Sequence, residues 1–346
     1  MTAKKQRLFY LDFIRAIAAI SIVITHFNVR YLVHIPEIKG KMIGVQKIGN
    51  IGSGEWGVSL FFIISGAALM YVYEKRDDWK QFYKKRFLSI YPMFWIAYGT
   101  VLGFYVLKNH MMIGKGVPKW RFIFTLLGVD GLLSVNGYQT FYLLGEWFLG
   151  TIILLYLIFP VLKKLLNTNL WITIVIVVMG YVASLGICNE ITIVSATVLF
   201  IRLPEFVFGM IFVKLRWKPQ WKTALSAMIL IIVNGIFKPE IAGSIQTTYI
   251  GIASFLVLVF VSGLVKNKGI QKFCEGISKY SYAVFLVHHI IIINVMNFVD
   301  LGKVSLFQSY ILFAIISCMI AVAAWGLYKI HGIIMRKACV IKKTVV

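Results

Sequence analysis

Long apolar segments constrain the fold of this chain more than any other feature. About ten of them approach the roughly 20 residues that a helix needs to cross a bilayer. They lie near residues 9–29, 55–73, 88–107, 140–162, 170–188, 194–213, 223–237, 246–265, 280–299 and 307–328. Charged residues make up 14% of the chain, against about 25% in soluble domains. The sequence therefore predicts an all-α, polytopic integral membrane protein with about ten transmembrane helices in one bundle.

The spacing of these segments predicts one transmembrane domain over residues 1–346, with no appended soluble domain. The longest connections, near residues 30–54 and 108–139, have room for short helices or re-entrant segments. The N-terminus is basic and is followed by an apolar run, as in a signal peptide. That run is too long and has no obvious small-residue cleavage site, so we expect it to be retained as the first helix.

The net charge of +23 would suit a nucleic-acid partner, but its distribution argues against one. Most lysines and arginines lie before the first helix, after the helices of even number, and at the C-terminus. This bias predicts that both termini are cytoplasmic. The positive charge then reflects membrane topology and attraction to anionic lipid. We expect the lipid bilayer, rather than nucleic acid, as a partner.

The first apolar segment, LDFIRAIAAISIVITHF, contains ionisable residues that are costly inside a membrane. Arg15 and His26 are eleven residues apart, about three helical turns, so both project from one face and are separated by about 16 Å along the axis. Asp12 lies three residues before Arg15 and can pair with it. A ligand with an anionic head and a reactive tail would suit this spacing. The alternative is an interfacial arginine and a histidine that caps the helix.

Other polar positions in apolar segments have both functional and structural interpretations. Ser65 and the glycine after it allow another backbone to approach. Three successive cations form either a topology signal or a phosphate site; they are Lys84, Lys85 and Arg86. Glu146 is predicted near the depth of His26, where a carboxylate could orient an imidazole and raise its basicity. Trp147 has the position of an interfacial aromatic residue.

The later segments contain two further groups of candidates. Arg202 and Glu205 are three residues apart and can neutralise each other. His288 and His289 are adjacent, so we expect them to point in different directions and not to serve one site. No pair of His, Asp or Glu residues has metal-ligand spacing on one helix, and the sequence therefore predicts no metal site.

Taken in order, these segments resemble the membrane-bound acyltransferase family 3 over about residues 8–290. The family's motifs are LDxxRaxA…H, FFxxSG, RRxxRxxP, W…Y…P, RxPEFxxG and SYxxYLxH. The matching residues are Leu11, Asp12, Arg15, Ala18, His26, Phe61, Phe62, Ser65, Gly66, Lys85, Arg86, Pro92, Trp147, Tyr156, Pro160, Arg202, Pro204, Glu205, Phe206, Gly209, Ser281, Tyr282, Leu286 and His288. The chain departs from the family at Lys85, Ser89 and Phe285, where the motifs have arginine, arginine and tyrosine.

The resemblance implies transfer of an acyl group, acetyl by default, from acyl-CoA to a hydroxyl of a carbohydrate. The products would be surface or exported glycans of bacteria, made at the plasma membrane by a multi-pass enzyme. Acyl-CoA, by default acetyl-CoA, would be a co-substrate, and no permanently bound cofactor is expected. His26 would act as general base or carry the acyl group briefly.

The resemblance and the residue pattern together suggest roles for the remaining candidates. Glu146 is our candidate for orienting His26. The donor would be bound by Arg15, Ser65, Lys84, Lys85 and Arg86. The residues that shape the acceptor side or hold the bundle would be Asp12, Trp147, Arg202, Glu205 and His288.

Two other functions suit the same helices. A transporter or flippase of lipid-linked glycans would use Arg15 and His26 as gate or substrate contacts. A non-enzymatic membrane sensor is favoured by one feature, the loss of arginine at Ser89. Consumption of a labelled acyl-CoA separates the enzyme from both. The sequence does not name the acceptor, and it leaves a homo-oligomer open.

Overall fold

The structure is a computed structural model that describes residues 7–34, 40–109, 114, 116–145, 147–190 and 193–344. Its contacts divide the chain into two compact units. Unit 1 contains residues 1–25, 44–79 and 151–279, and unit 2 contains residues 26–43, 80–150 and 280–346. The prediction of a single domain stays a prediction.

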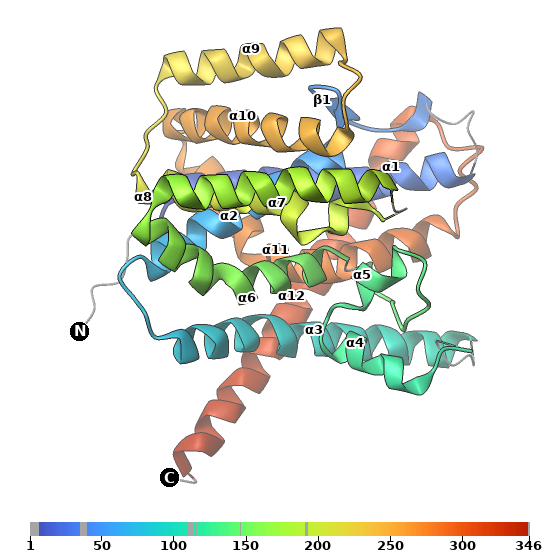
Figure 1. The fold of residues 1–346 in the computed structure, drawn as a ribbon. Coiled ribbons are helices and arrows are strands. Elements are labelled where there is room, and N and C mark those ends of the chain that lie inside the picture. Colours follow the sequence, from blue (N-terminus) through green and yellow to red (C-terminus); the bar gives the residue numbers. More distant parts are fainter. Residues whose placement is uncertain are drawn as a thin grey trace. The chain divides into compact units, whose positions relative to one another are not determined.

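The elements are almost all helical (Figure 1). In chain order they are α1 (Phe9–His34), β1 (Lys47–Ile48), β2 (Ile51–Gly52), α2 (Ser53–Tyr73), α3 (Trp79–Asn109), η2 (Lys119–Arg121), α4 (Phe122–Leu126), α5 (Asp130–Ser134), α6 (Trp147–Thr168), α7 (Leu170–Glu190), η3 (Ser195–Thr197), α8 (Leu199–Lys214), α9 (Trp221–Phe237), α10 (Gly243–Leu264), α11 (Lys268–Met296) and α12 (Leu306–Thr344).

Within the described residues, eight helices are long and apolar enough to cross a membrane. They are α1, α2, α3, α6, α7, α10, α11 and α12. The two shorter helices, α8 with 16 residues and α9 with 17, correspond to the sixth and seventh predicted segments. The prediction of an all-α polytopic membrane protein is confirmed.

Helix boundaries differ from the predicted segments in two situations. Either charged side chains adjoin an apolar run, or the backbone next to that run is irregular. Helices α3 and α11 begin at Trp79 and Lys268, well before residues 88 and 280, because basic side chains extend a helix that a hydropathy pattern does not detect. Helix α8 is short because Val198 has extended backbone between it and η3. Short helices and re-entrant segments were both open for the two long connections; the one at 108–139 contains short helices, whereas the one at 30–54 contains a hairpin.

In unit 1, the main neighbour of α2 is α8. A Cβ atom on Gly66 of α2 would lie 1.9 Å from the carbonyl oxygen of Phe206 in α8. A Cβ atom on Gly209 of α8 would lie 2.0 Å from the carbonyl oxygen of Ile63 in α2. The two helices therefore pack backbone to backbone, which confirms that Gly66 permits a close approach.

The hairpin β1–β2 lies against α9 and α10 in the same unit (Figure 1). Its turn residues, Gly49 and Asn50, both have positive φ angles, as a two-residue turn of type I′ requires. Asn234 of α9 donates a hydrogen bond of 2.6 Å to the carbonyl oxygen of Gly49. Asn50 donates one of 3.0 Å to Gln246 of α10, so side-chain amides fix the hairpin to both helices.

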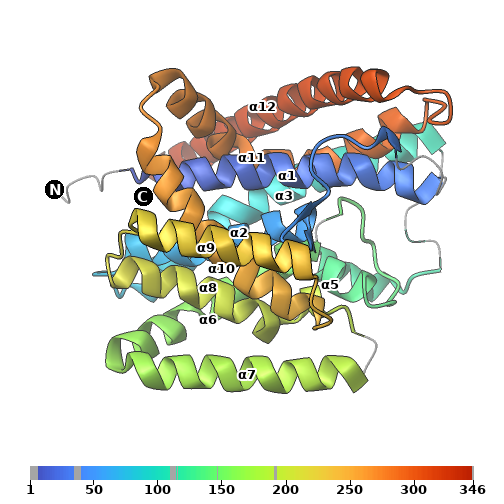
Figure 2. The ribbon, with the colours of Figure 1, turned by 90° about the horizontal axis from the view of Figure 1, so that it is seen from above.

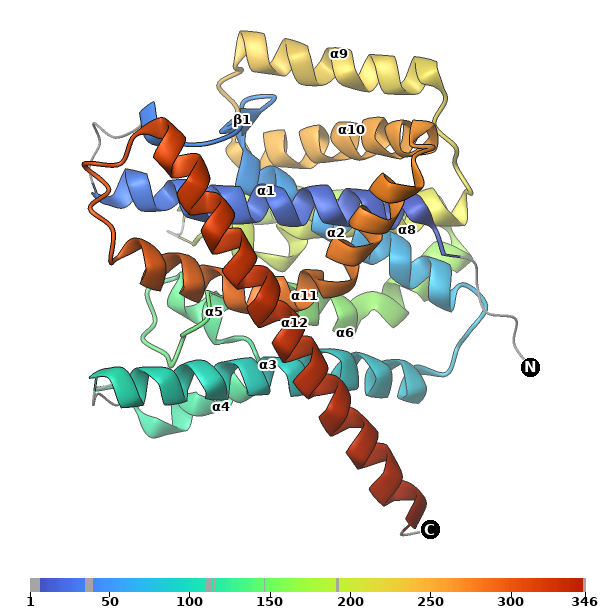
Figure 3. The ribbon, with the colours of Figure 1, turned by 180° about the vertical axis from the view of Figure 1, so that it is seen from behind.

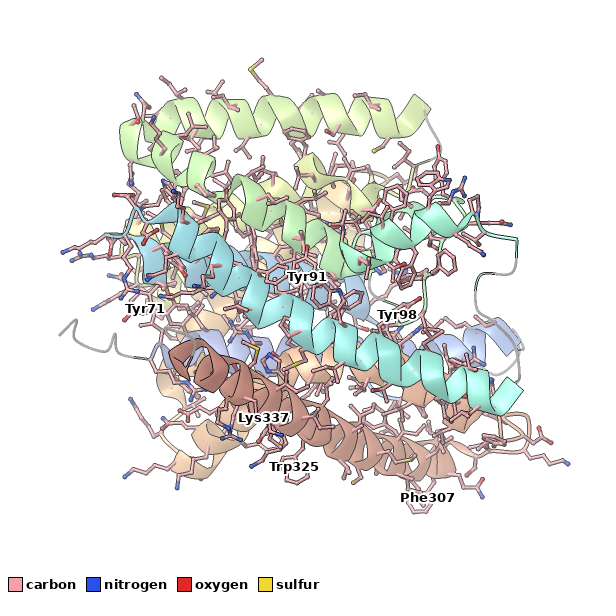
Figure 4. All side chains as sticks on the ribbon, turned by 90° about the horizontal axis from the view of Figure 1, so that it is seen from below. Tyr71, Tyr91, Tyr98, Phe307, Trp325 and Lys337 are labelled. Atoms are coloured by element: carbon pink, nitrogen blue, oxygen red, sulfur yellow. The ribbon has the colours of Figure 1, made fainter. Side chains whose placement is uncertain are left out.

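Large apolar side chains are exposed on α7 of unit 1 and on α12 of unit 2. The course of α7 is seen in Figure 2 and that of α12 in Figure 3. Trp171, Met179 and Val182 are exposed along α7. Phe307 and Trp325, labelled in Figure 4, project outward from α12. Exposed faces of this kind are suited to contact with lipid acyl chains.

In unit 2, side chains from α3 and η2 hold the segment that follows α5. Tyr98 of α3, labelled in Figure 4, donates a hydrogen bond of 2.7 Å to the carbonyl oxygen of Phe141. Arg121 donates one of 2.9 Å to the carbonyl oxygen of Gln139. The Asp130 carboxylate at the start of α5 is buried, and this burial raises its pKa although Thr125 donates a hydrogen bond to it.

Candidate active site

Three histidine rings from α1 and α11 meet in unit 2. The ring centroid of His26 lies 5.0 Å from that of His288 and 5.0 Å from that of His289, edge to face in both cases. His288 and His289 both contact one ring, so the geometric ground for predicting that they cannot serve one site does not hold. Adjacent residues of a helix do point in different directions, but the ring of His26 contacts both.

Hydrogen bonds distinguish His288 from the other two histidines. Its Nδ1 atom lies 3.1 Å from the carbonyl oxygen of Val284 and 2.8 Å from that of Phe285. Its side chain is buried, and no described residue is a hydrogen-bond partner of its Nε2 atom. Within the described chain, neither ring nitrogen of His26 or His289 makes a hydrogen bond, so only the ring of His288 is fixed by hydrogen bonds to the backbone.

A glycine of the segment before α6 contacts the cluster. Gly145 has a φ of +85°, and a Cβ atom there would lie 2.6 Å from Nδ1 of His289. This position is therefore restricted to glycine twice, by backbone conformation and by the imidazole. The sequence analysis did not identify Gly145. Its position just before α6, which begins at the candidate residue Trp147, was a signal that could have pointed to it.

Arg30 is a second residue that the sequence analysis did not identify as part of a site. It follows His26 by four residues on α1, which places both on one face of the helix. Its Nη2 atom donates a hydrogen bond of 2.5 Å to Asn297. Arg30 is thus a cationic neighbour of the histidine cluster along the same face of α1.

Arg15 belongs to a polar cluster in unit 1. Its Nη1 atom donates a hydrogen bond of 3.0 Å to Ser278 of α11 and lies 3.9 Å from the carboxylate of Asp12. Ser278 in turn donates a hydrogen bond of 2.5 Å to Asp12. Arg7 also pairs with Asp12, and this hydrogen bond raises the pKa of Arg7. The predicted pairing of Asp12 with Arg15 is confirmed, whereas Ser278 and Arg7 were not anticipated.

The continuous helix α1 connects the two predicted positions of the first motif. Arg15 and His26 both lie within Phe9–His34 without a break. Their separation of about 16 Å along one helix face, with Arg15 in unit 1 and His26 in unit 2, stays an expectation from helix geometry. Their joint role in holding one ligand stays a prediction.

The candidate phosphate-binding residues lie in the first turns of α3, in unit 2. Lys84 and Lys85 are exposed and Arg86 is half-buried. Lys85 donates a hydrogen bond of 3.1 Å to Gln81, and the Ser89 hydroxyl donates one of 3.0 Å to the carbonyl oxygen of Arg86. Ser89, which stands where the family motif has arginine, thus forms its hydrogen bond with the backbone of its own helix.

The remaining candidates lie in three other places. Ser65 is half-buried on α2 in unit 1, beside the glycine that contacts α8. Trp147 is the first residue of α6, and its backbone closely approaches Gly131 of α5. Glu146, our candidate for orienting His26, lies outside the described residues.

Arg202 and Glu205 form a buried ion pair in unit 1. The Nη1 atom of Arg202 lies 3.3 Å from Oε1 of Glu205, and both side chains are almost fully buried. Arg202 also donates a hydrogen bond of 3.2 Å to the carbonyl oxygen of Ala196 and lies over the ring of Phe62. These contacts confirm the predicted pair and connect α8 with η3 and α2, as a structural ion pair would.

The arrangement in unit 2 is suited to proton transfer and acyl chemistry. Three imidazoles in contact offer a base and a nucleophile. Within the described residues, no group of three His, Cys, Asp or Glu side chains is arranged to hold a metal ion.

Comparison with known proteins agrees with this chemistry. A family model described as an acyltransferase domain, Acyl_transf_3, matches residues 8–329. The chain belongs to this acyltransferase family. The protein is therefore an acyltransferase that moves groups other than aminoacyl groups, and the family predicted from the order of the motifs is confirmed. No curated protein and no solved structure matches this acyltransferase significantly.

Proposed function

We propose that this acyltransferase moves an acyl group, by default acetyl, from cytoplasmic acyl-CoA to a hydroxyl of a surface or exported carbohydrate. The observation that carries the proposal is the contact of His26 with two further imidazoles of α11. Acyl transfer to a hydroxyl needs a group that removes a proton or briefly holds the acyl group, and imidazole does both near neutral pH. The bacterial plasma membrane is the proposed location, with both termini in the cytoplasm.

The proposed donor and the proposed acceptor rest on different observations. The basic start of α3 offers cations for the phosphates of CoA, and arginine and lysine are the usual partners of phosphate. The carbohydrate acceptor is proposed on the family resemblance together with the position of the histidines toward the predicted outer end of α1. Arg15 is already bonded to Ser278 and Asp12, so its part in donor binding remains a separate proposal.

The test uses purified protein in detergent or nanodiscs. Acetyl-CoA is added with and without a crude cell-surface glycan extract, and release of free CoA thiol is followed. We expect release that increases with the extract. No release under any condition, together with no CoA binding by titration, would contradict the proposal and favour a transporter of lipid-linked glycan.

Replacement of Arg86 by alanine tests the donor site. We expect the Michaelis constant for acetyl-CoA to rise by about tenfold, the effect of losing one charge-assisted hydrogen bond of about 1.4 kcal/mol. The limiting rate should change less, because the charge binds phosphate equally in the ground state and the transition state. Lys218→Ala, at an exposed basic residue of unit 1 that has no proposed role, is the control for the loss of one positive charge. An unchanged Michaelis constant in Arg86→Ala would remove Arg86 from the donor site.

A further inference from the structure

The hydrogen bonds of His288 determine where its ring carries a proton. Both groups near its Nδ1 atom are backbone carbonyl oxygens, at 3.1 and 2.8 Å. A carbonyl oxygen only accepts hydrogen bonds, so Nδ1 must be the donor and must carry the proton. The lone pair of the neutral ring is therefore on Nε2.

The Nε2 atom of His288 is a buried acceptor without a donor in the described chain. The residue is 2% exposed, and polar atoms buried this deeply are nearly always hydrogen-bonded. Its ring packs against His26, at a centroid distance of 5.0 Å. A hydroxyl group brought to this position would supply the donor that Nε2 requires.

A catalytic histidine base is usually held by a hydrogen bond at the nitrogen that does not react. The Nδ1–H group of His288 donates this bond, which is shared between two backbone carbonyl oxygens of its own helix. Among the described residues, no equivalent bond holds His26 or His289. We propose that Nε2 of His288 is the general base that removes the proton of the acceptor hydroxyl, and that His26 acts on the acyl group.

This inference rests on the proposed function and assigns one of its steps. The acceptor oxygen forms a bond to the acyl carbon while its O–H bond breaks and the proton passes to Nε2 of His288. The bond from the acyl carbon to its leaving group breaks, and the leaving group keeps the electron pair. When His26 carries the acyl group, its ring nitrogen bonds to the acyl carbon as the CoA thiolate leaves, and the His26 imidazole is the leaving group when the acceptor oxygen attacks. In direct transfer the leaving group is the CoA thiolate itself. In both routes the thiolate takes a proton from Nε2 of His288 or from water. The roles of His26 and His288 are therefore distinct.

The decisive experiment compares two acceptors in a His288→Gln variant. Glutamine leaves a polar side chain at this position but no base. Transfer from acetyl-CoA to the hydroxyls of the glycan extract should fall by about 10²–10³-fold, within the range of a lost general base. Transfer to hydroxylamine, a nucleophile that attacks at neutral pH without losing its proton first, should change little after subtraction of the reaction without enzyme.

Two further variants serve as a control and as a second test of His288. His331→Gln removes a histidine of α12 whose Nε2 is also buried without a described partner, and it should leave both reactions unchanged. His288→Phe keeps a ring at the position and should behave like His288→Gln. An equal loss with hydroxylamine and with glycan would show that His288 does not act on the acceptor hydroxyl and would overturn the inference.

Failure of the inference is distinguishable from failure of the proposed function. If wild-type protein releases no CoA thiol with either acceptor, the proposed function fails. If the wild type is active and His288→Gln retains transfer to the glycan extract, only the role of His288 fails.

Discussion

The His26→Ala protein is expected to lose acyl transfer from acetyl-CoA by about 10⁴-fold, or about 5.5 kcal/mol of transition-state stabilisation. The loss should be the same with the glycan extract and with hydroxylamine, because His26 is proposed to act on the acyl group that both acceptors attack. This is the upper part of the range for removal of one group that transfers a proton or forms a bond in the reaction. Single-turnover transfer of labelled acetyl groups would measure it.

The folded state should tolerate this substitution. Within the described residues, His26 makes ring contacts with His288 and His289 and no hydrogen bond, so removal of its ring leaves no buried polar partner newly unpaired. The variant should elute as the wild type does in detergent. His331→Ala, on α12, is the control for loss of a histidine elsewhere in unit 2. Near-normal turnover of His26→Ala would contradict the assigned role.

The sequence predicted the helical fold well because the signal for a spanning helix is local. A run of apolar residues of sufficient length is enough to identify it, and all ten predicted segments correspond to helices. The errors lie where local hydropathy is not decisive. The start of α11 at Lys268 and the break at Val198 depend on backbone hydrogen bonding and neighbours, not on apolar content.

The candidate site was predicted only in part, because contacts between helices have no local signal. His26 was identified from its spacing to Arg15. His289 was set aside on the geometry of its own helix, but the position of a partner ring on α1 decides whether both histidines take part. Ser278 and Gly145 are small residues whose importance comes from the groups against them, a carboxylate and an imidazole. No pattern in a single sequence specifies those neighbours.

Gly66→Ala is expected to lower the free energy of unfolding by at least about 1–3 kcal/mol, the usual cost of adding a carbon atom to a well-packed core. The added Cβ atom would lie 1.9 Å from the carbonyl oxygen of Phe206. A backbone oxygen cannot turn away as a side chain can, so α2 and α8 must separate. The thermal unfolding midpoint in one detergent, followed by size-exclusion chromatography after heating, would measure the effect.

Gly263→Ala provides the matched control in the same unit. Gly263 lies near the end of α10, and a Cβ atom there would have no neighbour within 4 Å. Alanine at an open helical position should stabilise by about 0.5–1 kcal/mol, because it restricts the unfolded chain. The two substitutions are chemically identical and should therefore change the midpoint in opposite directions. Equal midpoints for wild type and Gly66→Ala would contradict the close packing of α2 and α8.

The two glycines also explain why the second and fifth family motifs belong together. Gly66 ends FFxxSG and Gly209 ends RxPEFxxG, and each faces a carbonyl oxygen of the other motif's helix. These motifs thus form one helix–helix contact in addition to whatever chemistry their polar residues perform. Because either alanine forces the same separation, Gly66→Ala combined with Gly209→Ala should cost clearly less than the sum of the single effects. Strict additivity would mean that the two glycines relieve separate contacts.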